Sequence, residues 1–339
     1  MKLLENYPLK KVTTFHVRTS ALYYTEFASV KELKEILSSE FVKINPYTVL
    51  GGGSNILFTR DYDGIIMRNI FKGISVVKEE GDNIFIKANS GERWHNFVLY
   101  CVNNNYGGIE NLSLIPGTVG AGPIQNIGAY GVELKDVLAE VEAINIKTQE
   151  VQTFTNAECK FGYRESIFKH EVKGKYIILS VTLKLAKNPA KVNVAYGSLS
   201  KELQDEGITN PTIKDVSNAV IKVRSSKLPD PEKIGNAGSF FKNPVIRGAQ
   251  FEELKNKFPD IVSFPGTEGL TKLAAGWLIE QCGWKGKRFG DAGVHTDQAL
   301  VLVNYDDATG KEIYDLSTKI IQSVKEKFGV ELEREVNMI

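Results

Sequence analysis

The sequence predicts an α+β fold built from more than one domain. Three observations support this. The 339 residues exceed the roughly 100–200 residues of one ordinary domain. The first half consists mainly of short β-branched runs with few helices, whereas helical spacing dominates the second half. The pattern changes near residues 190–210, where we expect a domain boundary, and no internal repeat or low-complexity linker interrupts it.

In the first half, a helix is expected over 29–39, because apolar residues recur at helical spacing behind Ser29, a favoured N-cap residue. A second amphipathic helix is expected over 93–105. The segment TVLGGGSNILF (48–58) indicates a strand, a tight glycine turn and another strand. Further strands are expected over 64–70, 74–78, 83–88, 141–146 and 176–185.

In the second half, Asn210-Pro211 is typical of a helix start, and four apolar residues follow it at helical intervals. Additional helices are expected over 250–258, 271–282 and 311–328, the last two ended by Gly283 and Gly329. A strand is expected over 298–304.

The charge balance and the cysteines exclude several classes of protein. The 42 Lys+Arg residues nearly equal the 41 Asp+Glu residues, so no electrostatic footprint for nucleic acid or an anionic membrane is present. The three cysteines lie far apart, which argues against a disulfide framework or a structural zinc site. The start lacks the apolar run of a signal peptide, and no stretch approaches ~18–20 apolar residues. A soluble cytoplasmic protein is expected.

Two glycine-rich stretches, 51–55 and 116–131, carry the strongest chemical signal. Glycine permits positive φ and close backbone approach, so such loops suit a pyrophosphate; tight turns are the alternative. The second stretch favours a loop that follows an extended ligand. Rossmann and P-loop fingerprints are missing, as is the G-x-S-x-G elbow of hydrolases, and the four histidines lack the spacing of metal ligands.

One cation, Arg164, lies among aromatic residues and glycine in KFGYRESIFK (160–169). A surface arginine lying across apolar neighbours would explain it. A guanidinium held in a partly dry site to meet developing negative charge would explain it as well. Arg164 alone does not decide between the two.

The motifs together resemble those of the UDP-N-acetylenolpyruvoylglucosamine reductases, flavoenzymes of bacterial cell-wall synthesis. The resemblance covers nearly the whole chain through GGGSN (51–55), LIPGTVGAGPIQNIGAYG (114–131), FGYRESIFK (161–169), GNAGSFFKNP (235–244), KLAAGWLIEQCG (272–283) and LEREV (332–336). It implies a two-lobed FAD-binding domain of the vanillyl-alcohol-oxidase type (1–70 and 71–190). A smaller α+β substrate domain (191–325) and a C-terminal tail (326–339) that returns to the active site would follow. YGSL (196–199) resembles the tyrosine loop of the type I enzymes.

The resemblance also implies a reaction and its residues. NADPH would reduce non-covalently bound FAD, and the enolpyruvyl ether of UDP-N-acetylglucosamine would then be reduced to UDP-N-acetylmuramate. Arg164 matches the catalytic arginine, Ser239 the proton donor and Glu335 the catalytic glutamate. From the residues alone, a turn after glycine is the favoured explanation of Ser239 and a solvated tail that of Glu335. An FAD-dependent oxidase of the same fold and a nucleotide-sugar-binding protein without catalysis are the rival functions.

The remaining site residues follow from the same resemblance. Those expected to bind FAD are Gly51, Gly52, Gly53, Ser54, Asn55, Pro116, Gly117, Thr118, Gly120, Ala121, Gln125, Asn126, Gly128, Ala129 and Gly131. Those expected to bind the substrate are Tyr196, Lys227, Asn243, Lys285 and Gln298, with Lys287 and Arg288 as competitors of Lys285. Phe264 stands where relatives often carry tyrosine. Asn337 stands where they often carry arginine, so a less firmly held tail is expected. No metal is expected, and the enzyme should be a monomer.

Overall fold

The chain forms two compact units in a computed structural model that describes residues 2–267 and 269–339. The first unit contains the residues up to Asn6, Leu22–Gly52 and Asp63–Ser226. The second contains Tyr7–Ala21, Gly53–Tyr62 and Lys227–Ile339. This division differs from the expected ranges, because 191–226 group with the first unit and two N-terminal segments group with the second.

The first unit begins with a four-stranded sheet in the order β1-β2-β5-β3. Its strands are β1 (Leu4–Pro8), β2 (Ser20–Phe27), β3 (Tyr47–Leu50) and β5 (Tyr62–Asn69), and β3 runs parallel to β5. Two helices, α1 (Val30–Ser38) and α2 (Glu40–Ile44), bury apolar side chains in the core of this sheet. Ser29 caps α1 by accepting a hydrogen bond from the Glu32 backbone N–H at 3.2 Å, which confirms the predicted helix start.

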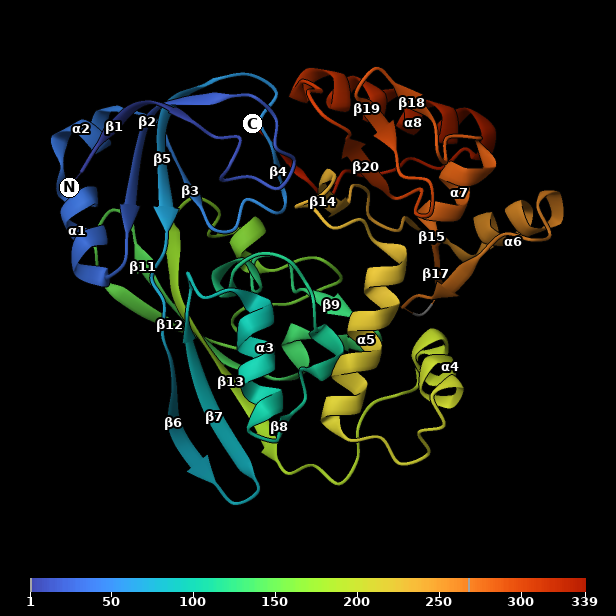
Figure 1. Ribbon diagram of the computed structural model, residues 1–339, viewed down its shortest axis with the longest axis horizontal. Coiled ribbons are helices and arrows are strands. Elements are labelled where there is room, and N and C mark those ends of the chain that lie inside the picture. The colour runs from blue at the N-terminus through green and yellow to red at the C-terminus, as the bar shows by residue number, and fades with distance from the viewer. Residues whose placement is uncertain (1, 268) are drawn as a thin grey trace. The chain divides into compact units, whose positions relative to one another are not determined.

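A six-stranded antiparallel sheet forms the rest of this unit's framework. The order is β12-β11-β13-β7-β6, with β8 also paired to β13. The strands are β6 (Ile74–Glu80), β7 (Asn83–Asn89), β8 (Tyr106–Gly107), β11 (Leu138–Asn145), β12 (Val151–Thr155) and β13 (Tyr176–Lys187). Helix α3 (Trp94–Asn103) shares a core with β7 and β13 and lies alongside them in Figure 1. Seven consecutive residues of β13 are buried, and they include two polar ones, Ser180 and Thr182, whose hydroxyls donate to Glu142 and Glu140.

Short elements organise the loops of the first unit. They are η1 (Glu110–Leu112), η2 (Val119–Ala121), β9 (Gly128–Ala129), β10 (Val132–Glu133), η3 (Leu134–Asp136) and η4 (Ile167–Lys169). Two helices follow, α4 (Gly197–Asp205) and α5 (Ile213–Lys227). They share a small core of their own, and α5 confirms the helix predicted after Pro211.

The second unit has two antiparallel sheets and one parallel strand pair. The first sheet orders β14 (Gly235–Ser239), β20 (Val301–Asn304), β19 (Ala292–Val294) and β18 (Arg288–Phe289). The second orders β15 (Val245–Arg247), β17 (Leu270–Leu273) and β16 (Ser263–Pro265). The parallel pair joins β4 (Ile56–Leu57) to β21 (Asn337–Met338). Helices α6 (Gly248–Lys257), α7 (Ala275–Gln281) and α8 (Gly310–Phe328) bury their apolar faces in one core.

One predicted element is wrong at its start. Residues 271–273 belong to strand β17 rather than to a helix, and α7 begins only at Ala275. The pairing of β17 with both β15 and β16 overrides the helical spacing of its apolar residues. In contrast, α8 ends as predicted, with Gly329 in the left-handed conformation (φ 64°). Among the described residues, no helix combines the length and the apolar character that a membrane span requires.

Candidate active site

A cavity of about 620 Å³ lies in the first unit. One side is lined by residues of β3, the following turn and β5, including Val49, Gly51 and Asn69. Ser90, the 118–124 segment and residues 176–178 of β13 are among its other lining residues. The volume lies within the roughly 300–1,000 Å³ typical of sites for small molecules and cofactors. The cavity therefore brings together four of the expected cofactor residues, Gly51, Thr118, Gly120 and Ala121.

The glycine turn packs directly against the 117–118 segment. A Cβ atom on Gly51 would lie 2.3 Å from Thr118 Oγ1, and one on Gly52 would lie 2.9 Å from the Gly117 Cα. These two glycines are required by close approach. Positive φ, the other reason to expect glycine in this turn, applies only to Gly53 (φ 64°). Gly51 and Gly52 belong to the first unit, and Gly53, Ser54 and Asn55 belong to the second.

The side chain of Asn126 holds the 116–131 loop in its conformation through hydrogen bonds. It is fully buried, with Nδ2 donating to Glu133 Oε2 and to the Gly162 carbonyl, both at 3.0 Å. Its Oδ1 accepts from the Lys135 backbone N–H at 3.0 Å. Since these bonds use both amide hydrogens, this side chain supports the loop and has no donor left for a ligand. Of the other expected residues in the loop, Pro116 and Gly131 are exposed, and Gln125, Gly128 and Ala129 are half-buried.

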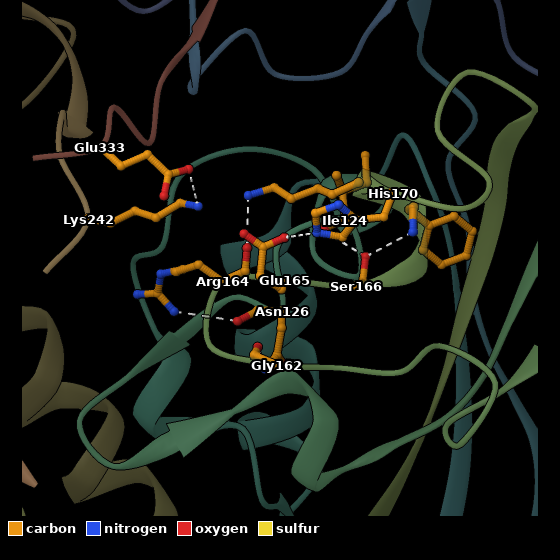
Figure 2. A network of polar contacts seen from close by, with 11 residues as sticks. Ile124, Asn126, Gly162, Arg164, Glu165, Ser166, His170, Lys242 and Glu333 are labelled. Atoms are coloured by element: carbon orange, nitrogen blue, oxygen red, sulfur yellow. Dashed lines mark hydrogen bonds and ion pairs between the residues drawn. The ribbon is translucent and has the colours of Figure 1, made fainter. Parts of the chain in front are cut away.

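Arg164 is held against this loop rather than lying free on the surface. Its guanidinium donates to the Gly128 carbonyl at 3.0 Å and to the Asn126 carbonyl at 3.4 Å. Figure 2 shows the second of these contacts. A Cβ on Gly128 would come within 3.3 Å of the guanidinium, so the missing side chain makes this contact possible. The backbone of Arg164 is left-handed (φ 58°), an uncommon conformation for a residue with a side chain. The partly buried position agrees with the second explanation of this arginine.

A second cation, Arg224 on α5, was missed by sequence reasoning. Its Nε donates to the Leu114 carbonyl at 3.3 Å. Burial lowers the pKa of Arg224, and the Arg164 cation acts in the same direction, so the two guanidinium groups lie within each other's electrostatic influence. The available signal was an arginine four residues after Val220 on the apolar stripe of α5.

Leu114, which leads into the 116–131 loop, is fixed from both sides. Its backbone N–H donates to His95 Nδ1 at 2.9 Å, and its carbonyl accepts from Arg224. Leu114 itself is left-handed (φ 58°). Burial lowers the pKa of His95, with a further contribution from the Arg224 cation, so the imidazole is neutral at pH 7 and Nδ1 can accept.

Tyr196 lies beside Tyr130, a tyrosine of the 116–131 loop. The rings of Tyr130 and Tyr196 meet edge to face, with their centroids 5.3 Å apart. Tyr196 is the residue before α4 and is 43% exposed, so most of one side of the ring remains accessible. The segment containing YGSL thus forms the start of a helix whose Leu199 and Leu203 are buried.

In the second unit, the structure brings the segments of Ser239 and Glu335 together. Ser239 ends β14, which is irregular between Asn236 and Ser239, and its hydroxyl forms no hydrogen bond with any residue in the described part of the chain. The Glu335 backbone N–H donates to the carbonyl of Phe240, the residue after Ser239, at 2.8 Å. Both Ser239 and Glu335 are half-buried.

The tail that carries Glu335 is firmly held, so the contrary expectation is wrong. Asn55 Nδ2 donates to the Glu335 carbonyl at 3.3 Å, and Asn337 donates to the Asn55 carbonyl through its backbone N–H (3.1 Å) and its Nδ2 (3.0 Å). Strand β21 then pairs with β4. Backbone pairing, rather than an arginine at position 337, fixes the tail.

The other expected substrate residues differ in exposure and in the bonds that their side chains already form. Lys227 is exposed at the end of α5. Asn243 Oδ1 accepts from the Ala275 backbone N–H at 2.9 Å, and Gln298 Oε1 accepts from the Leu300 backbone N–H at 3.4 Å. Lys285 pairs with Glu280 at 3.1 Å. The two competitors of Lys285 also have partners: Lys287 lies over the Trp284 ring, and Arg288 forms an ion pair with Asp291.

Phe264 lies on β16, and Lys272 Nζ lies over its ring, 5.8 Å from the ring centre.

Comparisons with known proteins agree with this arrangement. Residues 21–155 match a family model described as an FAD-binding domain, and residues 230–339 match the C-terminal domain of UDP-N-acetylenolpyruvoylglucosamine reductase. A curated protein of that name from Flavobacterium johnsoniae is 52% identical over the full length of both chains. Another from Chromobacterium violaceum is 48% identical over 96% of each. The crystal structure of the Thermus caldophilus reductase is 23% identical, has a TM-score of 0.65 and covers 99% of this chain and 98% of its own, which supports the fold.

Proposed function

The chain belongs to the UDP-N-acetylenolpyruvoylglucosamine reductase family, and on this premise we propose how its residues carry out the reaction. It is an NADPH-dependent flavoenzyme that reduces UDP-N-acetylglucosamine enolpyruvate to UDP-N-acetylmuramate in peptidoglycan precursor synthesis. The observation that carries this conclusion is the 52% identity to a reductase over its full length.

The cavity of the first unit suits FAD. Glycines packed against 117–118 leave the backbone open to a pyrophosphate, and Gly120 lies so close to Ser90 that a Cβ there would be 2.6 Å from the Ser90 Cβ. We propose that Gly51, Gly52, Thr118 and Gly120 hold the cofactor. When bound, FAD accepts hydride from NADPH and delivers it to the substrate.

Arg164 is the residue we propose for stabilising the charge that develops on the substrate. Hydride adds to the vinyl methylene, which becomes a methyl group, and the electron pair of the double bond moves onto the neighbouring carbon and the carboxylate. A guanidinium fixed by two loop carbonyls meets this charge without reorganising. Arg224 adds a second positive charge to the same region.

Ser239 is proposed to donate the proton that completes the reduction. A serine hydroxyl is a weak acid, so it can protonate only a strongly basic, enolate-like carbon and must then be reprotonated. The Glu335 backbone N–H donates to the carbonyl of Phe240, the residue after Ser239, and Glu335 is proposed to assist at this step. Both residues belong to the second unit and are proposed to act at this protonation step.

The nucleotide part of the substrate is assigned to the remaining residues. We propose that Tyr196 covers the uridine diphosphate, as in the type I enzymes, and that Lys227 faces the diphosphate. Asn243, Lys285 and Gln298 would add polar contacts. For Lys285 this requires its ion pair with Glu280 to open, and its side chain is 34% exposed, so this exchange costs little.

Two coarser features complete the proposal. Among the described residues Cys101, Cys159 and Cys282 are free thiols, which fits a reducing cytoplasm. We also propose that the enzyme is a monomer, and sedimentation analysis of the flavin-loaded protein would test this.

A two-step flavin experiment tests the function. The purified protein should be yellow, should bleach when NADPH is added without oxygen, and should regain its colour when the enolpyruvyl substrate follows. Mass spectrometry should find the product two hydrogens heavier than the substrate. A colourless protein would favour a binding module, and rapid recovery of colour in air without substrate would favour an oxidase.

A further inference from the structure

The tail from Gly329 to Ile339 binds its own unit on two sides. One side is backbone pairing: Phe241 and Arg334 form an antiparallel bridge, and the Lys242 backbone N–H donates to the Glu333 carbonyl at 2.9 Å. These bonds fix where the Glu335 backbone lies. As in any strand pairing, they also set which side of the tail each side chain occupies.

The side chain of Arg334 supplies the second anchor. Its Nε donates to Ser317 Oγ at 2.8 Å, and one terminal nitrogen donates to Thr318 Oγ1 at 2.6 Å. The guanidinium also lies over the ring of Tyr314, 4.5 Å from its centre. All three partners belong to α8, so Arg334 is clamped to one helix.

The hydroxyl acceptor at Ser317 is itself fixed. Ser317 is completely buried, and its hydroxyl donates to the Tyr314 carbonyl at 2.6 Å, which turns the oxygen lone pairs toward Arg334. No carboxylate in residues 2–267 and 269–339 forms an ion pair with Arg334. The clamp is therefore directional, made of oriented donors and a ring face rather than a diffuse charge attraction.

Successive side chains of an extended segment point to opposite sides. Holding Arg334 on α8 therefore directs Glu335 away from α8. We infer that Arg334 is a positioning residue for Glu335: its clamp on Tyr314, Ser317 and Thr318 holds the tail in this pairing and so presents the glutamate. This inference rests on the proposed role of Glu335.

The test compares Arg334→Met, which keeps an apolar stem, with Arg334→Lys, which keeps the cation over the ring. The control is Glu331→Gln, which removes another link between tail and α8, the exposed Lys325–Glu331 pair at 3.1 Å. Stopped-flow absorbance measures the NADPH step and the substrate step separately. Hydrogen exchange of the tail peptide measures its order independently of activity.

We expect Arg334→Met to slow the substrate step about 10–100-fold, because a misplacement of about 1 Å costs that much, and to leave the NADPH step unchanged. Tail exchange should accelerate in this variant, Arg334→Lys should fall between it and the wild type, and Glu331→Gln should behave as wild type. The double variant Arg334→Met/Glu335→Gln should be no slower than Glu335→Gln alone.

Three results would overturn the inference, each in a distinguishable way. A slow Glu335→Gln beside a normal Arg334→Met would remove the positioning role and leave the proposed role of Glu335 intact. A normal Glu335→Gln would refute that proposed role itself, and Arg334 would then position nothing catalytic. A slow Arg334→Met with unchanged tail exchange would mean that Arg334 acts by another route.

Discussion

Replacing Gly51 by alanine should weaken FAD binding through a single steric conflict. The new Cβ would lie 2.3 Å from Thr118 Oγ1, about 1.1 Å short of the 3.4 Å at which ordinary contact begins. Thr118 cannot easily retreat, because it is buried, bridges to Arg93, and is followed by Val119, whose backbone N–H donates to the Glu92 carbonyl at 2.9 Å. Overpacking of this kind costs about 1–3 kcal/mol, which corresponds to roughly 5–150-fold in affinity.

The assay is titration of the apoprotein with FAD, followed by flavin fluorescence, with a thermal unfolding curve for each variant. Gly248→Ala is the matched control, since its Cβ would meet nothing closer than 3.5 Å. Removing the obstacle should relieve the conflict. In Thr118→Ala, the atom nearest to a Cβ on residue 51 would be the Cβ of residue 118, at 3.5 Å. Gly51→Ala/Thr118→Ala should therefore bind FAD as well as Thr118→Ala alone. Unchanged affinity of Gly51→Ala, or additive losses in the double variant, would refute the reasoning.

Three further predictions concern separate steps of the same enzyme. Ser239→Ala should reduce its flavin with NADPH at the normal rate, yet react with the substrate about 10²–10⁴-fold more slowly, as stopped-flow absorbance would reveal; equal slowing of both steps would place Ser239 at the flavin instead. Tyr196→Ala should weaken substrate binding about 5–150-fold by calorimetry and leave the NADPH step untouched, because the ring is proposed to cover the nucleotide and not to take part in flavin reduction; an unchanged dissociation constant would contradict this role of Tyr196. The lowered pKa of His95 means that the unfolded chain binds a proton at higher pH than the folded chain does, so the free energy of unfolding should fall as pH drops below about 6.5. His95→Gln should lose part of this dependence in denaturant titrations at pH 7 and pH 5.5, and an unchanged dependence would refute this role of His95.

The elements that the sequence predicted well are those with local signals. Helix α1 follows from Ser29 and a regular apolar spacing, and the end of α8 follows from Gly329. The strand over 270–273 could not be foreseen, because two partner strands decide its conformation and its own spacing suggests a helix. Caps and apolar spacing can be recognised within a short stretch of sequence, but the partners of a strand cannot.

The candidate site divides in the same way. Motif residues such as Arg164 and Gly51 could be identified from the sequence, yet their contacts could not. Asn126 illustrates this, because a buried amide that serves its own loop looks identical in sequence to one that serves a ligand. Arg224 lies outside the motifs, and the LEREV motif gave no role to Arg334; their contacts appear only in the structure, with Arg224 on α5 and Arg334 bound to α8.

The parallel pairing of β4 with β21 has a consequence for how the chain folds. Asn55 and Glu335, which a hydrogen bond joins beside this pairing, lie 280 residues apart, so the contact is among the most non-local that a chain of this length can form. Ribosomes add roughly 5–20 residues per second, so β4 waits for its partner for roughly 15–55 s during synthesis. Throughout that time one edge of β4 offers free backbone donors and acceptors to other strands. The second unit, assembled from three separate stretches of chain, is therefore the part most exposed to mispairing and most dependent on chaperones before the tail arrives.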